Sequence, residues 1–383
     1  MAAPQLPIGF LRFHDDDFVN YQLNRAYALG TLPRTVAERG AARIRGPEDV
    51  PEVFGALADE AEREARWTEA AGCARVAEFF TLRPSEAQVA AYERYRALWD
   101  QSVEDEEVTR HEVPYEGGYL SALTRPAVGE RRGTVLFFGG FDSVIEEFFP
   151  IWRGLSEAGF DVIAFDGPGQ GGARTLHDVP HTHDWERPVA AVLDHFGIER
   201  AALVGMSMGG YWAIRAASRE PRIVAVVAWA AVYDWLARFP RFVGAFVRRM
   251  IGWTKFMNTT IRWRMRLFPI LRHVVAQANW MTRSSEPVQA ARWFLGMNAE
   301  HQGSERVTVP TLIFAGEHDR FQPLALAKLQ ERALTGAPVT MRVFTAAENA
   351  DQHCQMGNLP LATAELCDWL GKTMGADTRE RAA

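Results

Sequence analysis

Cysteine is scarce in this sequence, and long apolar runs and a leader segment are missing. The three cysteines, Cys73, Cys354 and Cys367, are too few and too scattered for a disulfide framework or a zinc site. No stretch reaches about 18 uninterrupted apolar residues, which argues against a membrane span. The first residues also lack the charged and apolar regions of a secretory signal. These absences predict a reduced, cytoplasmic protein that does not insert stably into a membrane.

Positive charge is also in deficit, because 48 Asp and Glu outnumber 42 Lys and Arg and leave a net charge of −6. This balance argues against a nucleic-acid partner. The small-molecule partner that we expect follows from the motifs described below. With 383 residues and 48% hydrophobic content, the chain is long enough for one large α/β domain with an appendage, or for two domains.

One internal segment, 235–285, contains no Asp or Glu. Its position between two predicted strands allows it to fold over one end of a sheet as a lid. In that interpretation Trp253 and Trp263 contact a bulky substrate, and an arginine meets an anionic group on it. Two alternatives stay open: a solvated basic face with an apolar underside, or attraction to an acidic carrier protein or membrane surface. The basic residues are Arg238, Arg241, Arg248, Arg249, Lys255, Arg262, Arg264, Arg266, Arg272 and Arg283.

The texture of the sequence changes near Val108. Residues 1–107 hold few strand signals and show helical spacing, with Ser85 placed to cap a helix. Beyond them, TRHEVPYEGGYLSALTRP is typical of a hairpin, and short apolar runs then alternate with helical stretches. Nearly continuous apolar runs are typical of parallel strands that are covered on both faces. The pattern therefore predicts an α/β protein with a mostly parallel, doubly wound sheet.

The predicted domains follow from these changes. A helical N-terminal domain covers 1–107, the α/β core covers 108–234 and 286–375, and the basic, aromatic lid insertion covers 235–285. The predicted parallel strands are 134–138, 161–165, 201–204, 223–229, 311–315 and 340–344.

The pentapeptide GMSMG, 205–209, matches the pattern G-x-S-x-G. A predicted buried strand precedes it and a predicted helix follows it, which is the context of a nucleophile elbow. The glycines leave room for a sharp turn that exposes the hydroxyl of Ser207 at the carboxyl end of the sheet. The N–H of Met208 is then placed to donate to an oxyanion.

A serine hydroxyl needs a base and an orienting acid before it becomes a good nucleophile. In this architecture the acid and then the histidine follow the serine along the chain. Asp319 and His353 each lie in a loop that follows a predicted strand, at the sheet edge where such folds bind ligands. We therefore expect Ser207 to act with His353 as base and Asp319 as orienting acid, with His318 and Asp351 as competitors for those two roles.

The loop after the first predicted parallel strand is expected to supply the second oxyanion donor. Gly139 and Gly140 allow its backbone to approach a substrate oxygen, and the N–H of Phe141 is the first candidate. Asp142 is the next candidate and a possible substrate contact. Glu146 and Glu147 are typical of the acidic first turn of a helix.

Five stretches together resemble the α/β-hydrolase superfamily: TVLFFGGFDS, FDVIAFDGPGQGG, the GMSMGG helix, GEHDRFQP and DQHCQMGNLPLATAELCDWL. More closely, they are similar to the branch that holds dihydroxypseudooxynicotine hydrolase, the FrsA-like esterases and the polyketide-shortening hydrolases. The resemblance covers most of 75–372. It implies an α/β-hydrolase fold, hydrolysis without metal or organic cofactor, and a role in secondary metabolism. It also implies that the N-terminal helices close the pocket or form a homodimer contact.

This branch includes both esterases and enzymes that cleave C–C bonds. In the C–C-cleaving member, a glutamate beyond the nucleophile helix takes part. The corresponding stretch VYDWLARFPRF offers Asp234, a candidate substrate contact, and has Arg238 near the expected glutamate position. This departure leaves ester, lactone or thioester chemistry open beside C–C cleavage. Cys354, next to the expected base, is interpreted as a packing residue.

The sequence thus predicts a serine hydrolase for an ester, lactone or ketone bond of a bulky, aromatic or polyketide-like molecule. An acyltransferase or cyclase with the same three residues is the alternative, because the sequence does not show whether water reaches an acyl-enzyme. A binding protein without activity is a third class, but such proteins usually lose one of the three residues.

Overall fold

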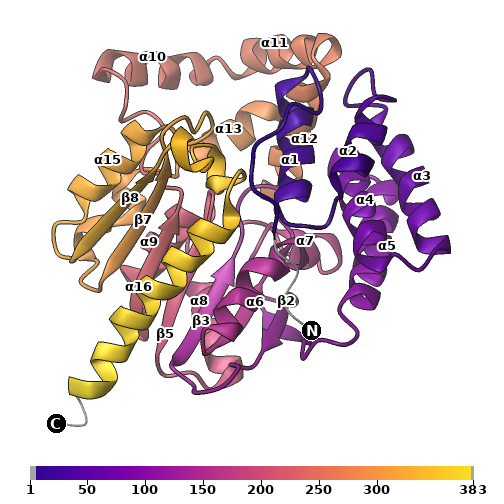
Figure 1. Cartoon of the computed structure of the whole chain (residues 1–383). Coiled ribbons are helices and arrows are strands. Elements are labelled where there is room, and N and C mark those ends of the chain that lie inside the picture. Colours follow the sequence, from indigo (N-terminus) through magenta and orange to yellow (C-terminus); the bar gives the residue numbers. More distant parts are fainter. Residues whose placement is uncertain (1–5, 381–383) are drawn as a thin grey trace.

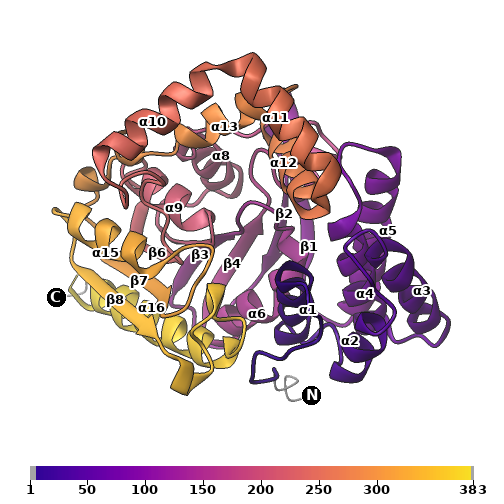
Figure 2. The same ribbon diagram turned by 90° about the horizontal axis from the view of Figure 1, so that it is seen from above.

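The computed structural model describes residues 6–380 (Figure 1). Five helices precede the first strand and make up the N-terminal lobe; α2 to α5 form one side of the molecule in both views, while α1 lies nearer its middle (Figure 2). The Ser85 hydroxyl accepts a hydrogen bond of 3.1 Å from the N–H of Gln88, so it caps the fifth helix as its sequence position indicates. The helices are α1 (Asp17–Ala28), α2 (Arg34–Ala41), α3 (Val50–Arg63), α4 (Trp67–Phe80) and α5 (Glu86–Ser102).

The core is an eight-stranded sheet with the order β1-β2-β4-β3-β5-β6-β7-β8. The first two strands form an antiparallel hairpin, β2 pairs antiparallel with β4, and all other neighbours are parallel. The predicted mostly parallel, doubly wound sheet is confirmed. The strands are β1 (Thr109–Tyr115), β2 (Gly118–Arg125), β3 (Gly133–Phe138), β4 (Phe160–Phe165), β5 (Ala201–Met206), β6 (Ile223–Trp229), β7 (Thr311–Gly316) and β8 (Val339–Phe344).

Both faces of the sheet are buried, which is why its strands are apolar without alternation. On β3, Val135 and Phe137 pack with the N-terminal lobe, α6 (Phe149–Glu157) and α16 (Leu359–Glu380). The side chains between them, Leu136 and Phe138, belong to the opposite face. That face is covered by α8 (Glu186–Phe196), α9 (Gly209–Ala217) and α15 (Leu324–Ala333). Among residues 6–380, no helix has the length and apolar character to cross a bilayer.

Short helical segments connect these elements. They are η1 (Ile145–Phe148), α7 (Gly171–Thr175), η2 (Ser304–Arg306), η3 (Ala346–Glu348) and η4 (His353–Gln355).

A helical insertion between β6 and β7 covers the carboxyl end of the sheet (Figures 1 and 2). It continues past residue 285, where the sequence suggested that the core resumes. The N–H of Val288 donates to Asn258 at 3.0 Å, so α13 is fastened to α11 and belongs to the insertion. Its helices are α10 (Arg241–Gly252), α11 (Thr254–Leu267), α12 (Pro269–Thr282), α13 (Pro287–Leu295) and α14 (Ala299–Gln302).

Two helical glycines of the N-terminal lobe provide a matched stability test. A Cβ at Gly72 would lie 2.2 Å from the carbonyl oxygen of Thr31, whereas a Cβ at Gly55 would meet nothing within 4 Å. We expect Gly72→Ala to lower the free energy of unfolding by about 1–3 kcal/mol, because the backbones must separate. Gly55→Ala should leave it unchanged or raise it by up to about 1 kcal/mol. Urea denaturation measures the free energy of unfolding of both variants. Equal effects would contradict the tight packing of α4 on the loop between α1 and α2, which contains Thr31.

Candidate active site

Ser207 lies at a sharp turn between β5 and α9 with φ of 59°, a left-handed conformation that is unusual for a residue with a side chain. The turn is possible because backbone crosses backbone at two glycines. A Cβ at Gly205 would lie 2.1 Å from the carbonyl oxygen of Gly209, and one at Gly209 would lie 2.6 Å from that of Gly139. The geometry expected of a nucleophile elbow is therefore present.

The three side chains selected from the sequence form one hydrogen-bonded chain. Ser207 Oγ lies 2.9 Å from His353 Nε2, and His353 Nδ1 lies 2.6 Å from Asp319 Oδ2. The other carboxylate oxygen of Asp319 accepts the N–H groups of Phe321 and Gln322, each at 2.8 Å. With Nδ1 donating to the carboxylate, Nε2 is left to accept the proton of the serine hydroxyl.

Electrostatics favour a proton on this imidazole. Burial of His353 disfavours its charged form, but the adjacent Asp319 carboxylate and the Cys354 side chain together outweigh burial and raise the pKa of His353 well above its ordinary value. The competing pair lies elsewhere: His318 Nδ1 is 3.0 Å from Asp351 Oδ2, and the His318 side chain is 60% exposed. Sequence reasoning thus distinguished the pair that reaches Ser207 from the pair that does not.

The thiol of Cys354, interpreted from the sequence as a packing residue, contacts the imidazole of His353. Its Sγ lies 3.4 Å from His353 Nε2, and its side chain borders the same cavity as Ser207. The residue has φ of 52°, so the loop turns sharply just after the histidine. The Cys354 thiol therefore packs against His353 Nε2, the same nitrogen that lies beside Ser207 Oγ.

The loop after β3 faces Ser207 closely. A Cβ at Gly140 would lie 2.8 Å from the Cβ of Ser207 and 3.0 Å from the backbone nitrogen of Met208. The N–H of Gly140 itself donates to Ser143 Oγ at 2.7 Å. Within residues 6–380, the N–H groups of Met208 and Phe141 donate to no other group, so both are available to a substrate oxygen.

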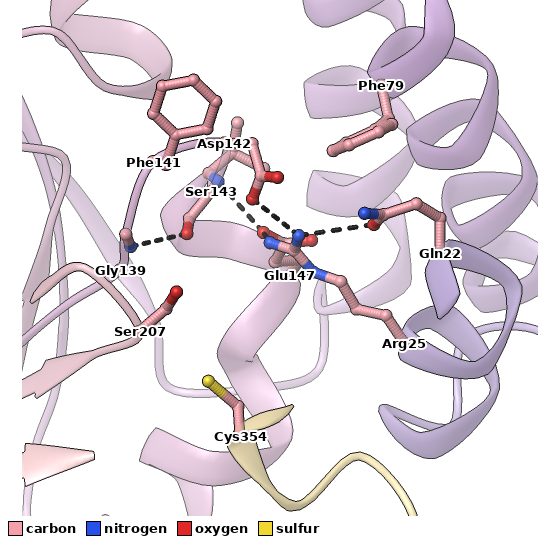
Figure 3. A network of polar contacts seen from close by, with 12 residues as sticks. Gln22, Arg25, Phe79, Gly139, Phe141, Asp142, Ser143, Glu147, Ser207 and Cys354 are labelled. Carbon is pink, nitrogen blue, oxygen red and sulfur yellow. Dashed lines mark hydrogen bonds and ion pairs between the residues drawn. The ribbon is translucent and has the colours of Figure 1, made fainter. Parts of the chain in front are cut away.

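A buried network of ions joins this loop to the N-terminal lobe (Figure 3). Arg25 of α1 bonds Asp142 at 2.8 Å and also pairs with Glu147, while Arg75 of α4 lies 3.2 Å from Glu147. Arg75 also donates to the carbonyl oxygen of Asp142 at 2.7 Å. Both arginines and Glu147 are less than 10% exposed. The sequence suggested only an acidic residue in the first turn of a helix for Glu147, and it gave no signal for either arginine.

The charges of this network balance. Glu78 completes it by accepting from Arg75 and Arg83, so three guanidinium groups face the carboxylates of Asp142, Glu147 and Glu78. Burial alone would raise the pKa of Asp142, but the adjacent guanidinium of Arg25 holds this pKa below its ordinary value. Asp142 is therefore an ionised group that fixes the loop.

A cavity of about 610 Å³ opens above Ser207. Its wall is mostly apolar and comes from three parts of the chain. The polar groups that reach it include Gln22, Arg25, Asp142, His273 and Gln277. The apolar lining includes Phe18, Tyr21 and Phe79 from the N-terminal lobe, Trp235, Ile251, Val274 and Phe294 from the insertion, and Met206, Phe321 and Met356 from the core.

The insertion reaches the cavity with residues other than those expected. Trp253 and Trp263 are 53% and 58% exposed and do not border it, because they lie on the outer side of α10 and α11. Asp234 also lies outside the lining; its carboxylate caps the N–H of Leu236 at 2.8 Å. Trp235, the neighbour of Asp234, borders the cavity instead. A helix presents different residues to its two sides, and sequence alone did not show which side faces inward.

The helix α12 holds both the cavity wall and the loop after β3. Gln277 Nε2 donates to the carbonyl oxygen of Phe141 at 2.9 Å. His273, one turn earlier, packs against Phe18, Phe79 and Phe80 of the N-terminal lobe. Burial lowers the pKa of His273 to about 4, so its imidazole is neutral near pH 7.

These features define an α/β hydrolase, and comparison with known proteins agrees. The profile of the family described as serine aminopeptidase, S33, matches residues 129–347. The chain belongs to this family.

Relatives extend the likeness over nearly the whole chain. Hydrolase LUC6 from a Fusarium species is 28% identical over 94% of this chain and 97% of that protein. The 20-hydroxy-prefusarin hydrolase FUS2 of Gibberella moniliformis is 29% identical over 80% of this chain and 83% of its own. The crystal structure of 2,6-dihydroxy-pseudo-oxynicotine hydrolase superposes with a TM-score of 0.69 at 22% identity, over 92% of this chain and 96% of that one. The resemblance inferred from the motifs is therefore confirmed at the level of fold and family.

The buried network predicts an unequal cost for two similar substitutions. Glu147→Gln leaves Arg25 and Arg75 with an uncompensated buried charge, so we expect the free energy of unfolding to fall by about 3–5 kcal/mol. The control is Glu38→Gln, which removes an exposed pair with Arg34 and should cost at most about 0.5 kcal/mol. Chemical denaturation of both variants measures the difference, and a Glu147→Gln cost as small as that of the control would contradict the stabilising role.

Proposed function

We propose that this α/β hydrolase is a serine hydrolase that transfers an acyl group to water. The observation that carries the proposal is the hydrogen-bonded chain from Ser207 through His353 to Asp319, set at a left-handed turn that borders the cavity. Nucleophile, base and orienting acid in this order are what acyl transfer by a hydroxyl requires.

In the proposed reaction, His353 Nε2 takes the hydroxyl proton as Ser207 Oγ attacks the substrate carbonyl. The N–H groups of Met208 and Phe141 bind the oxyanion that forms, each contributing on the order of 3 kcal/mol to the transition state. His353 then gives its proton to the leaving group. Water enters, loses a proton to the same nitrogen, and releases the acid while the serine recovers its hydrogen.

The cavity supports a bulky, uncharged substrate. Its volume of about 610 Å³ suits a small molecule of drug size, and its wall is mainly apolar. Arg25 is already neutralised by Asp142 and Glu147, and Arg320, the other arginine of the lining, pairs with Asp17. The buried arginine of the lining is therefore neutralised, which favours an uncharged substrate over the anionic group considered from the sequence.

Asp142, Gln22 and the neutral His273 offer hydrogen bonds instead, and these suit a hydroxyl or keto group. The likeness to a hydrolase named for 20-hydroxy-prefusarin agrees with a natural-product substrate of secondary metabolism. We propose an ester, lactone or ketone bond in such a molecule as the point of cleavage. The segment that carries the extra glutamate in the C–C-cleaving member supplies no carboxylate to the cavity here, and this favours C–O cleavage.

The proposal predicts that Ser207→Ala loses hydrolysis of aryl esters and lactones by at least about 10⁴-fold while its thermal unfolding is unchanged. Wild type should also react covalently with a fluorophosphonate at Ser207, as read by mass spectrometry. Undiminished hydrolysis by the variant would refute the assignment. Formation of a new ester or ring in place of the free acid would identify an acyltransferase or cyclase with the same three residues.

The pH dependence of the reaction reports on the Asp319–His353 pair. The base must be neutral to accept the serine proton, so kcat/KM should rise with pH through the pKa of His353, above the ordinary histidine value of about 6.5. Asp319→Asn removes the carboxylate that raises this pKa, so the rising limb should move to lower pH and kcat should fall by roughly 10⁴-fold. Asp351→Asn, which changes the carboxylate that bonds His318 and Gln352, is the control and should keep the wild-type profile. An unshifted limb in Asp319→Asn would exclude this carboxylate as the partner of the base.

A further inference from the structure

The outer side of α10 and α11 exposes a concentration of aromatic side chains, here called the lid face. It comprises Phe242, Phe246, Trp253, Phe256 and Trp263, which are between 53% and 74% exposed. Among residues 6–380, every exposed tryptophan and every exposed phenylalanine except Phe321 lies between residues 239 and 268. Large apolar side chains gathered in this way mark an interaction surface, whereas scattered ones are ordinary.

Spacing and one ring contact relate these side chains to one another. Phe242 and Phe246 lie at i and i+4 and share one side of α10. Trp253 directly follows α10, and its ring centroid lies 6.4 Å from that of Phe256 in α11. On α11, Phe256 and Trp263 are separated by seven residues and also share a side. Another residue of α10, Ile251, borders the cavity. The lid face is therefore not needed to close the cavity.

The charge on this surface is positive and unbalanced. Arg241, Arg248, Arg249, Lys255 and Arg264 are all exposed, and none pairs with a carboxylate within the described part of the chain. The segment 235–285 contains no acidic residue. Contact between two copies through the same face would bring like charges together around its two-fold axis. The surface thus requires a partner that is both apolar and negatively charged.

An anionic lipid surface supplies both properties. Aromatic rings settle at the boundary between headgroups and acyl chains, and flanking arginines and lysines bind lipid phosphates. We propose that the lid face binds peripherally to membranes that contain anionic lipid, with α10 and α11 lying in the plane of the headgroups. Figure 1 shows both helices along one border of the molecule, where a flat surface can reach them. This step rests on the proposed hydrolase function. The contact would place α10, which borders the cavity through Ile251, against the lipid bilayer in which a bulky apolar substrate dissolves.

Vesicle flotation with the full-length protein tests the proposal without reference to catalysis. One set of vesicles contains phosphatidylcholine alone and the other contains about 30% phosphatidylglycerol. We expect at least a tenfold larger bound fraction on the anionic vesicles, and a loss of most binding at about 0.5 M salt. Phe242→Ser with Trp263→Ser should reduce the bound fraction at least fivefold, as should Arg248→Glu with Arg249→Glu.

Matched controls separate the lid face from general effects of charge and apolarity. Lys328→Glu with Arg332→Glu makes the same charge change on exposed residues of α15, and Tyr119→Ser removes an exposed aromatic ring from β2. Both controls should bind vesicles as wild type does. Near-UV circular dichroism establishes that each variant is folded.

Three results would overturn the proposal. The first is no binding to either kind of vesicle. The second is equal binding to both kinds that the lid-face variants leave unchanged. The third is a dimer in sedimentation equilibrium that Phe242→Ser with Trp263→Ser dissociates, in the absence of vesicle binding, because the face would then be a contact between copies. Hydrolysis of a small soluble ester by the variants reports separately on the proposed function, since the lid face does not border the cavity.

Discussion

The ion pairs of Arg25 and Arg75 with Glu147 connect two parts of the chain that share neither a strand nor a helix. One part is the N-terminal helical lobe, and the other is the loop that faces the nucleophile elbow. Because these groups are buried, separating the lobe from the loop would leave a guanidinium as an uncompensated charge in a low dielectric, which is strongly unfavourable. The position of the loop, and with it the N–H of Phe141, therefore depends on helices that lie more than 60 residues earlier in the sequence. This dependence gives the lobe a role beyond that of a cover.

The cavity is a joint product of three structural units, each of which contributes a different kind of surface. The core supplies the hydrogen-bonded side chains of Ser207, Asp319 and His353 after the carboxyl ends of β5, β7 and β8. The lobe supplies aromatic walls and the balanced charges, and the insertion supplies Trp235, Ile251 and α12. Gln277 and His273 show how closely these units are fitted, since one bonds the loop after β3 and the other packs among phenylalanines of the lobe. Most of the cavity wall therefore comes from the lobe and the insertion, while the Ser207–His353–Asp319 chain comes from the core.

Local pattern was sufficient for the strands of the core and for the choice of three side chains that the structure places together. Strands buried on both faces are apolar without interruption, so β3 to β8 stood out in the sequence, and G-x-S-x-G between strand and helix identified Ser207. Asp319 and His353 followed because parallel strands bring all of their carboxyl ends to one edge. The choice of Asp319 and His353 rested on their loops and their order along the chain, and His318 was set aside because neighbouring side chains of a loop seldom both turn inward. The hydrogen bonds of the structure agree with that choice.

Contacts between segments that are distant in the sequence could not be predicted from local pattern. By itself the sequence determined the succession of core strands and helices along the chain, because side-chain periodicity distinguishes them. It also determined the sharp turn at Ser207, where glycines allow a close backbone crossing, and the loops that carry Asp319 and His353. Only the tertiary structure decided that Arg25 and Arg75 pair with Glu147, that Trp235 borders the cavity, and that Trp253 and Trp263 face outward. The reason is physical: the rotation of a helix about its axis and the choice of an ion-pair partner are set by the surfaces that pack against them, and those surfaces come from residues far away along the chain.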